Sequence, residues 1–248
     1  MTMQTFGPAH RFRPSFFFWL ALAMCFFVFG GFGLHSTLPA LRGEFPPAPP
    51  IVHLHGLVFV SWMLLLLVQT GLVSAGNLKL HRSLGLWGIA HAAAIMMLGL
   101  SMQLIASQRG WAAGRPAGTD GLYLGLLAVI GFCWMFAVAI RQRQRNPQVH
   151  KRMIMYAMLP VLPPGVNRFW ASALGIDDPV PTFWLYLTLW SMAAALLVHE
   201  WRTTGRISRW SIAGAAWIVV QGICHEAVVG TPWFDTVAGA VLSLVHYR

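Results

Sequence analysis

Seven long apolar runs, separated by short polar connectors, constrain this chain more than any other feature of its sequence. The runs cover about residues 15–34, 52–74, 84–106, 121–140, 152–173, 181–201 and 210–229. Each is close to the roughly 20 residues that an α-helix needs to cross the hydrocarbon core of a bilayer. No connector is long enough to form a second domain, so residues 1–248 are expected to form a single integral-membrane domain.

The composition excludes an ordinary soluble domain. Hydrophobic residues make up 57% of the chain and charged residues only 10%, whereas soluble domains carry about 25% charged residues. Helices are the expected spanning element because the bilayer core has no water to satisfy unpaired backbone groups. The sequence therefore predicts an all-α, multi-pass bundle of seven transmembrane helices. The apolar stretch 236–245 is too short to cross and predicts a short C-terminal interfacial helix.

The distribution of charge predicts the orientation, because Lys and Arg are retained on the cytoplasmic side of a membrane. With the N-terminus inside, 12 of the 17 basic residues lie on the cytoplasmic side: Arg11, Arg13, Lys79, Arg82, Arg141, Arg143, Arg145, Lys151, Arg152, Arg202, Arg206 and Arg209. Glu200 is the one acidic residue on that side. We therefore expect an N-in, C-out protein of a bacterial inner membrane. Its net charge of +10 then reflects contact with anionic lipid headgroups, and nucleic acid is not an expected partner.

The first apolar run has two interpretations. Arg11 and Arg13 precede it, and small residues follow it at Ser36 to Ala40, which is the order found in a cleaved signal peptide. However, the run is longer than the usual apolar region of a signal peptide. We therefore expect a retained transmembrane helix.

Ionisable residues near the helix ends are candidates for function, because such groups are costly in hydrocarbon. At the outer side, His53 and His55 begin the run 52–74. Two residues apart on a helix, they point to roughly opposite sides, and the seven-residue spacing to Trp62 and Gln69 selects His55 for the core. Alternatively, both histidines are solvated at the interface.

The end of the run 210–229 adds His225 and Glu226 at the same predicted depth. A His/His/Glu site that faces outward would suit a metal-dependent membrane enzyme. The candidate metal ligands are His53, His55, His225 and Glu226. The pair His55 and His225 is also a candidate for holding a haem iron.

At the inner side, His81 and His150 lie at matched depth, so that a haem iron or another metal would bridge them. Each has an arginine nearby and could equally belong to the positively charged belt. His91 lies about 10 Å deeper in the run 84–106. Its neighbours by depth predict either haem ligation with a methionine or a hydrogen-bonded core histidine; they are Met155, Tyr156 and Met158.

Prolines make the run 152–173 irregular. Pro160, Pro163 and Pro164 precede Asn167 and Arg168, and proline inside a helix removes a backbone hydrogen bond. A broken helix is tolerated in a membrane where neighbours, water or a cavity satisfy the freed groups. The sequence therefore predicts a polar pocket that opens outward, in which Arg168 binds an anionic group such as a haem propionate. Alternatively, Arg168 only reaches to the interface.

Two short motifs carry a resemblance to known proteins. Leu80-His81-Arg82-Ser83-Leu84-Gly85 and Asn146-Pro147-Gln148-Val149-His150-Lys151-Arg152-Met153 resemble helix-start motifs in a family of predicted bacterial integral-membrane proteins of unknown function. The resemblance covers about half of the chain, and it implies the architecture but no activity. The Leu-His-x-x-x-Gly segment is also similar to segments in transmembrane cytochromes b. That similarity implies haem b, although His81 and His91 do not have the usual spacing of a two-haem site.

Three functions follow as hypotheses. The first is a haem-binding redox protein that exchanges electrons with quinone or a periplasmic partner, with His55, His81, His91, His150, Arg168 and His225 as cofactor-binding candidates. The second is the metal-dependent membrane enzyme. The third is a non-catalytic subunit or assembly factor that binds other membrane-protein subunits. The sequence leaves open whether the chain is an enzyme.

Overall fold

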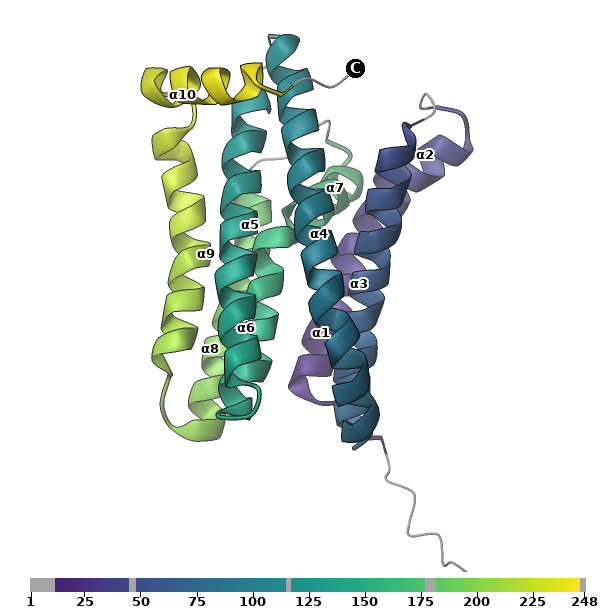
Figure 1. The fold of residues 1–248 in the computed structure, drawn as a ribbon, viewed down its shortest axis with the longest axis vertical. Helices are drawn as coiled ribbons and strands as arrows, with labels where there is room; N and C mark the ends of the chain where they lie inside the picture. The colour runs from purple at the N-terminus through teal and green to yellow at the C-terminus, as the bar shows by residue number, and fades with distance from the viewer. Residues whose placement is uncertain (1–11, 45–47, 115–116, 177–181, 246–248) are drawn as a thin grey trace, which may run out of the picture.

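The computed structural model describes residues 12–44, 48–114, 117–176 and 182–245, and these residues form helices without any strand (Figure 1). This confirms the all-α prediction. In chain order, the elements are α1 (Phe16–Phe32), a π-helical turn η1 (Gly33–Thr37), α2 (Leu38–Leu41), α3 (Pro50–Ser74), α4 (Leu78–Ala112), α5 (Ala117–Gln142), α6 (Pro147–Met158), a 3-10 turn η2 (Leu159–Val161), α7 (Pro163–Leu174), α8 (Thr182–Thr204), α9 (Arg209–Val228) and α10 (Pro232–Ser243).

Five helical segments in the described residues are long and apolar enough to cross a membrane. They are Phe16–Leu41, Pro50–Ser74, Leu78–Ala112, Thr119–Gln142 and Phe183–Thr204. The predicted runs 152–173 and 210–229 are also helical, but they do not belong to this group. The first of them is divided at the prolines, with α6 ending at Met158 and α7 beginning at Pro163. Seven crossings therefore remain a prediction.

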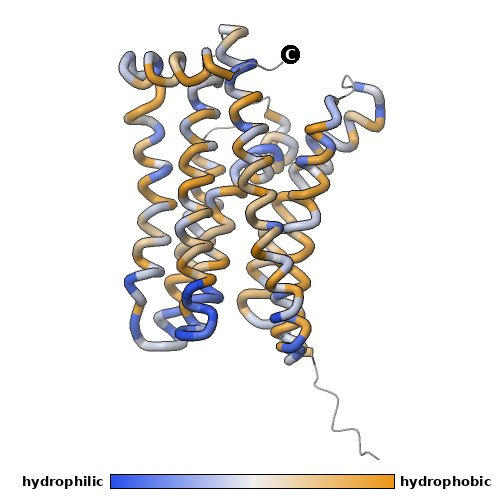
Figure 2. The backbone as a smooth tube through the Cα atoms, viewed as in Figure 1, coloured by the Kyte–Doolittle hydropathy of each residue, from blue (hydrophilic) through white to orange (hydrophobic). Residues whose placement is uncertain are grey.

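The surface of the bundle is apolar over most of its length. Large hydrophobic side chains such as Leu86, Trp87 and Met97 are more than two-thirds exposed. Figure 2 shows hydrophobic residues along the helices and hydrophilic stretches at the helix ends, most densely where α5 joins α6 and where α8 joins α9. An apolar surface of this extent suits contact with lipid.

Helix α4 joins two groups of helices. It begins after Asn77, whose side chain accepts a hydrogen bond from the Leu80 nitrogen at 3.1 Å. With 35 residues, it is about 52 Å long, well beyond the thickness of a hydrocarbon core. Its first half packs on α3, where Gly88 faces Leu65, and its second half packs on α5, where Gly125 leaves room for the side chain of Gln103. Figure 1 shows the resulting groups, with α1 and α3 on one side and α5, α6, α8 and α9 on the other.

The C-terminal helix α10 lies across one end of the bundle (Figure 1). Phe234, Ala238 and Leu242 on one of its faces are buried against α5, where they form a small second core with Leu122 and Tyr123. This is the short helix that the stretch 236–245 predicts, although it begins earlier, at Pro232. Its position at a membrane interface stays a prediction.

Helices α1 and α7 approach each other at two glycines. A Cβ atom on Gly31 would overlap the backbone oxygen of Gly165 and would lie 2.9 Å from the backbone nitrogen of Phe169. Backbone atoms cannot move aside as a flexible side chain can. The contact between α1 and the broken helix therefore depends on the absence of a side chain at Gly31.

We expect Gly31→Ala to lower the stability of the folded protein, because the added methyl group would force α1 away from α7. Overpacking of this kind costs about 1–3 kcal/mol. Thermal unfolding of the purified protein in detergent measures the effect. Gly33→Ala is the matched control, since a Cβ at Gly33 meets nothing within 4 Å. Equal unfolding temperatures for the two variants would contradict the proposed close contact.

Candidate functional site

Two helices present histidines at the same end of the bundle. We call this the basic end and define it by residues 75–82, 141–152 and 200–209, which contain most of the basic residues. His81 lies in the first turn of α4, and His150 lies in the first turn of α6. The side chain of Asn146 accepts a hydrogen bond from the Val149 nitrogen at 3.2 Å, as Asn77 does at the start of α4. Each asparagine cap fixes where its helix begins and thus where its histidine lies.

The imidazole rings of His81 and His150 lie within electrostatic range of each other. His150 Nδ1 is 2.9 Å from the carbonyl oxygen of Ala139, so Nδ1 carries a proton and donates it to this carbonyl. His81 Nδ1 is buried and has no hydrogen-bond partner. The structure therefore brings two imidazoles from distant parts of the chain within electrostatic range, and His81 Nδ1 is left without a hydrogen-bond partner.

Gln69 of α3 adds a second buried polar atom without a hydrogen-bond partner near His81. Its Oε1 atom is buried without a hydrogen-bond partner, and its backbone faces the ring of His81. Gly85, one turn along α4 from His81, lies beside the amide, since a Cβ there would be in ordinary van der Waals contact with Gln69 Nε2 at 3.9 Å. Buried polar groups without partners are uncommon, and a bound water or ligand is a usual reason for them.

An aromatic layer lies deeper in the bundle, about 10 Å from Gln69 along α3. The indole ring of Trp62 is 5.9 Å from the ring of Phe132 and 6.0 Å from that of Phe136, between ring centroids. Trp62 Nε1 donates to the sulfur of Met158 at 3.1 Å. This layer joins α3, α5 and α6 and gives the histidine pair an apolar boundary on the side of the bundle interior.

His91 is a hydrogen-bonded core histidine. Its Nε2 atom is 3.0 Å from the carbonyl oxygen of Val58 and 3.1 Å from Ser61 Oγ. Its ring stacks on Trp62 at 5.8 Å between centroids. Met158 was a candidate haem ligand together with His91. Its sulfur instead accepts the hydrogen bond from the Trp62 indole. Of the two interpretations of His91, the hydrogen-bonded one fits these contacts.

The histidines predicted at the outer side lie on two helices, with His53 and His55 on α3 and His225 on α9. His53 is exposed, whereas His55 is half-buried and packs on Phe59 with 4.4 Å between ring centroids. His225 on α9 is buried against Tyr123, at 5.7 Å. Figure 1 places α3 and α9 on opposite sides of the bundle. The side chain of Glu226 lies outside the described residues, and the described part of the chain contains no group of three His, Cys, Asp or Glu residues arranged to hold a metal ion.

Arg168 lies on α7, beyond the break in the helix. Its Nη1 donates to the carbonyl oxygen of Pro164 at 2.9 Å. That carbonyl belongs to the proline-rich stretch where the regular helix is interrupted. The guanidinium carbon is 4.7 Å from the centroid of the Phe32 ring, which is typical of a cation–π contact. These contacts hold the side chain against α7 and the end of α1.

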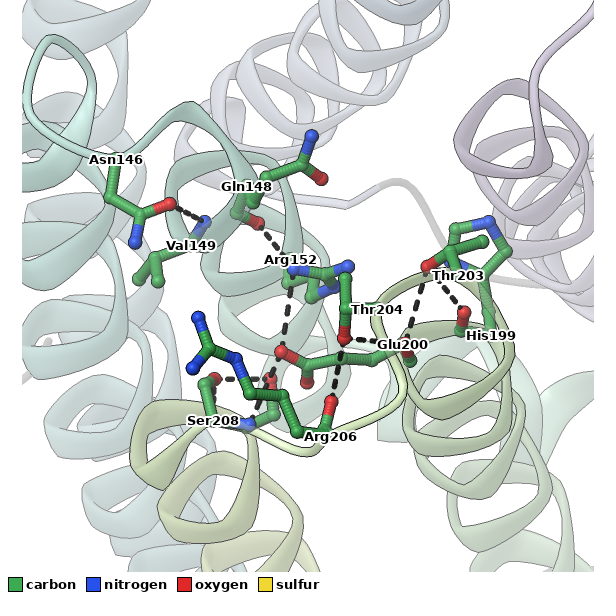
Figure 3. Close-up of polar contacts among 11 residues, drawn as sticks. Asn146, Gln148, Val149, Arg152, His199, Glu200, Thr203, Thr204, Arg206 and Ser208 are labelled. Carbon is green, nitrogen blue, oxygen red and sulfur yellow. Dashed lines mark hydrogen bonds and ion pairs between the residues drawn. The ribbon is translucent and has the colours of Figure 1, made fainter.

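A buried ion pair is the functional candidate that the sequence does not reveal. Arg152 Nη1 is 3.3 Å from Glu200 Oε1, and the two side chains are only 2% and 3% exposed (Figure 3). Glu200 Oε1 also accepts a hydrogen bond from the backbone nitrogen of Ser208 at 3.2 Å. The pair thereby joins α6, α8 and the start of α9. Its only signal in the sequence is that Glu200 is acidic among basic residues.

Comparisons with protein-family models, with curated proteins and with solved structures find no match to this chain. The candidate site therefore rests on its own geometry.

We expect Glu200→Gln to destabilise the protein strongly, because it leaves the charge of Arg152 buried without a counter-ion. Such a loss costs about 3–5 kcal/mol, and unfolding in detergent followed by tryptophan fluorescence measures it. Glu44→Gln is the control, since its ion pair with Arg42 is exposed and 3.9 Å long. The double variant Arg152→Gln/Glu200→Gln should recover much of the loss. A Glu200→Gln protein as stable as the control would contradict this account.

Proposed function

We propose that this chain is a seven-helix protein of the bacterial inner membrane that binds haem b between His81 and His150 and transfers electrons to quinone or to a periplasmic partner. The observation that carries the proposal is the pair of imidazoles that lie within electrostatic range of each other at the basic end. They come from separate helices, and the Nδ1 atom of His81 has no hydrogen-bond partner. Two axial histidines are a common ligand set for haem in proteins that carry electrons.

The topology rests on packing as well as on charge. Beyond the five apolar helices, α6 is buried over most of its second half, and α9 has 20 residues, enough for about 30 Å. The backbone is irregular between Met158 and Pro163. Met158, Leu159 and Leu162 are buried there, so this stretch is sheltered from lipid. If α6 with α7 forms one crossing and α9 forms another, the chain crosses seven times. The basic end then lies in the cytoplasm, and α10 lies at the outer interface.

The surroundings of the two histidines fit a haem group. The hydrogen bond from His150 Nδ1 to Ala139 orients the imidazole and increases its basicity, as is usual for a ligand histidine. His81 would supply the second ligand, because its Nδ1 atom has no hydrogen-bond partner in the protein. Trp62 and Phe136 would exclude water from the inner edge of the site. When bound, the haem supplies one-electron transfer.

The outward-facing metal enzyme has less support, because α3 and α9 lie on opposite sides of the bundle (Figure 1). A non-catalytic subunit is the outcome to accept if the protein carries no haem and copurifies with other membrane proteins. The haem proposal is therefore the one to test first.

We expect the purified protein to contain iron and to show the Soret band of a six-coordinate haem b. Both His81→Ala and His150→Ala should remove the band, because each deletes one axial ligand. His53→Ala is the control, since that side chain is exposed. An absorption spectrum with iron analysis, on protein produced with ample haem, is the measurement. A protein without iron, or a spectrum unchanged by both replacements, would refute the proposal.

The topology can be tested with reporter fusions. A reporter that is active only in the periplasm should be silent when fused after Arg143, between α5 and α6, and active when fused after Gly230, between α9 and α10. A reporter that is fluorescent only in the cytoplasm should give the opposite result at both positions. If both fusions reported the same side, the chain would cross the membrane an even number of times between them, and the proposed topology would be wrong.

A further inference from the structure

We propose that the Nε and Nη2 edge of Arg152 is a binding site for a phosphate group at the basic end. This inference does not depend on haem binding. Arg152 lies two residues after His150, about 200° further around α6, so the two side chains face different neighbours. The site belongs to α6, α8 and α9 (Figure 3).

The hydrogen bonding of Arg152 is incomplete on one edge only. Its Nη1 atom makes both contacts, at 3.2 Å to the carbonyl oxygen of Gln148 and at 3.3 Å to Glu200 Oε1. Nε and Nη2 are buried and have no partner. These two nitrogens form the side edge of the guanidinium, which binds two oxygens of one phosphate or carboxylate group. A charged edge buried in this way requires an acceptor.

The surrounding charges favour an anion. Lys151 and His199 lie within electrostatic range of Arg152. The end of α8 adds Arg202, the turn that follows adds Arg206, and the start of α9 adds Arg209. Among the described residues of the basic end, Glu200 is the only acidic one. The local excess of positive charge attracts an anionic ligand.

Glu200 restricts which phosphate-containing ligands fit the site. Its Oε2 atom is buried and lacks a partner, so it can accept a hydrogen bond from the bound molecule. A ligand with a donor close to its phosphate oxygens satisfies both residues together. Hydrogen phosphate has such a donor in its P–OH group, and phosphatidylglycerol has one in the hydroxyl groups of its headgroup.

The site is close to the aqueous phase. Exposed residues of the turn 203–207 cover the pair, and the backbone of Ser208 contacts it directly. Figure 3 shows Arg206 in this turn beside the pair, with its carbonyl oxygen accepting a hydrogen bond from Thr204 at 2.7 Å. A small movement of the turn would admit a phosphate group without disturbing the helices.

The test uses the full-length protein, delipidated in a phosphate-free sugar detergent. Inorganic phosphate and phosphatidylglycerol are added in separate titrations, with chloride as the control anion, and the unfolding temperature is measured. We expect saturable stabilisation by at least one phosphate source. Arg152→Lys keeps the charge but lacks the two-nitrogen edge, so the apparent affinity should fall at least about 10-fold.

Two further variants make the result decisive. Arg152→Gln/Glu200→Gln removes both charges without leaving one unpaired, and it should abolish the stabilisation. Arg143→Gln removes an exposed cation of the same end and should leave the stabilisation unchanged. An effect of inorganic phosphate identifies a free ion as ligand, and an effect of phosphatidylglycerol alone identifies a lipid headgroup. No effect of either source, or an equal effect in the double variant, overturns the proposal.

Discussion

Backbone hydrogen bonding is the constraint on which this structure depends. A chain with so apolar a surface has to satisfy its peptide groups within its own helices, and polar side chains are then left mainly for the places where helices begin. At the basic end, α1, α4, α6 and α9 all begin with a side-chain cap, from Ser15, Asn77, Asn146 and Ser208 respectively. The described helices α3 and α10, which begin at the opposite end, start at prolines and have no such cap. In the proposed topology, the helices that begin on the cytoplasmic side therefore have their first residue fixed by a side-chain cap, whereas α3 and α10 do not.

Close packing between helices depends on glycine rather than on hydrophobic attraction, because lipid is as apolar as the side chains. Gly121 and Gly125 on α5 accommodate Gln103 and Ser107 of α4, and Gly214 on α9 accommodates the ring of Tyr156. The contacts of Gly121 and Gly125 hold α4 against α5 in the half of the bundle away from the basic end. In the other half, α4 follows α3 instead, so His81 comes within electrostatic range of His150 from the other group of helices.

Much of the fold follows from the sequence, but only part of the site does. Hydropathy predicts α3 at 52–74, against an observed Pro50–Ser74, and the prolines predict the break before Pro163. Depth along a helix follows from counting residues, and counting places His81 and His150 at the same depth, where the structure has them within electrostatic range of each other. Lateral position does not follow from counting. His55 and His225 also have matched depths, yet their helices lie on opposite sides of the bundle (Figure 1). The contact between Arg152 and Glu200 cannot be predicted from residue counting either, because it depends on the lateral positions of α6 and α8.

The first turn of α6 shows why three adjacent residues have three different roles. Successive side chains on a helix diverge by about 100°, so neighbours in sequence face different elements. His150 bonds to Ala139 of α5 and lies within electrostatic range of His81 of α4. Lys151 lies 4.9 Å from the centroid of the Phe17 ring on α1. Arg152 pairs with Glu200 of α8. Because one capped turn orients all three side chains, a change in where α6 begins would displace the histidine site, the contact with α1 and the buried ion pair together.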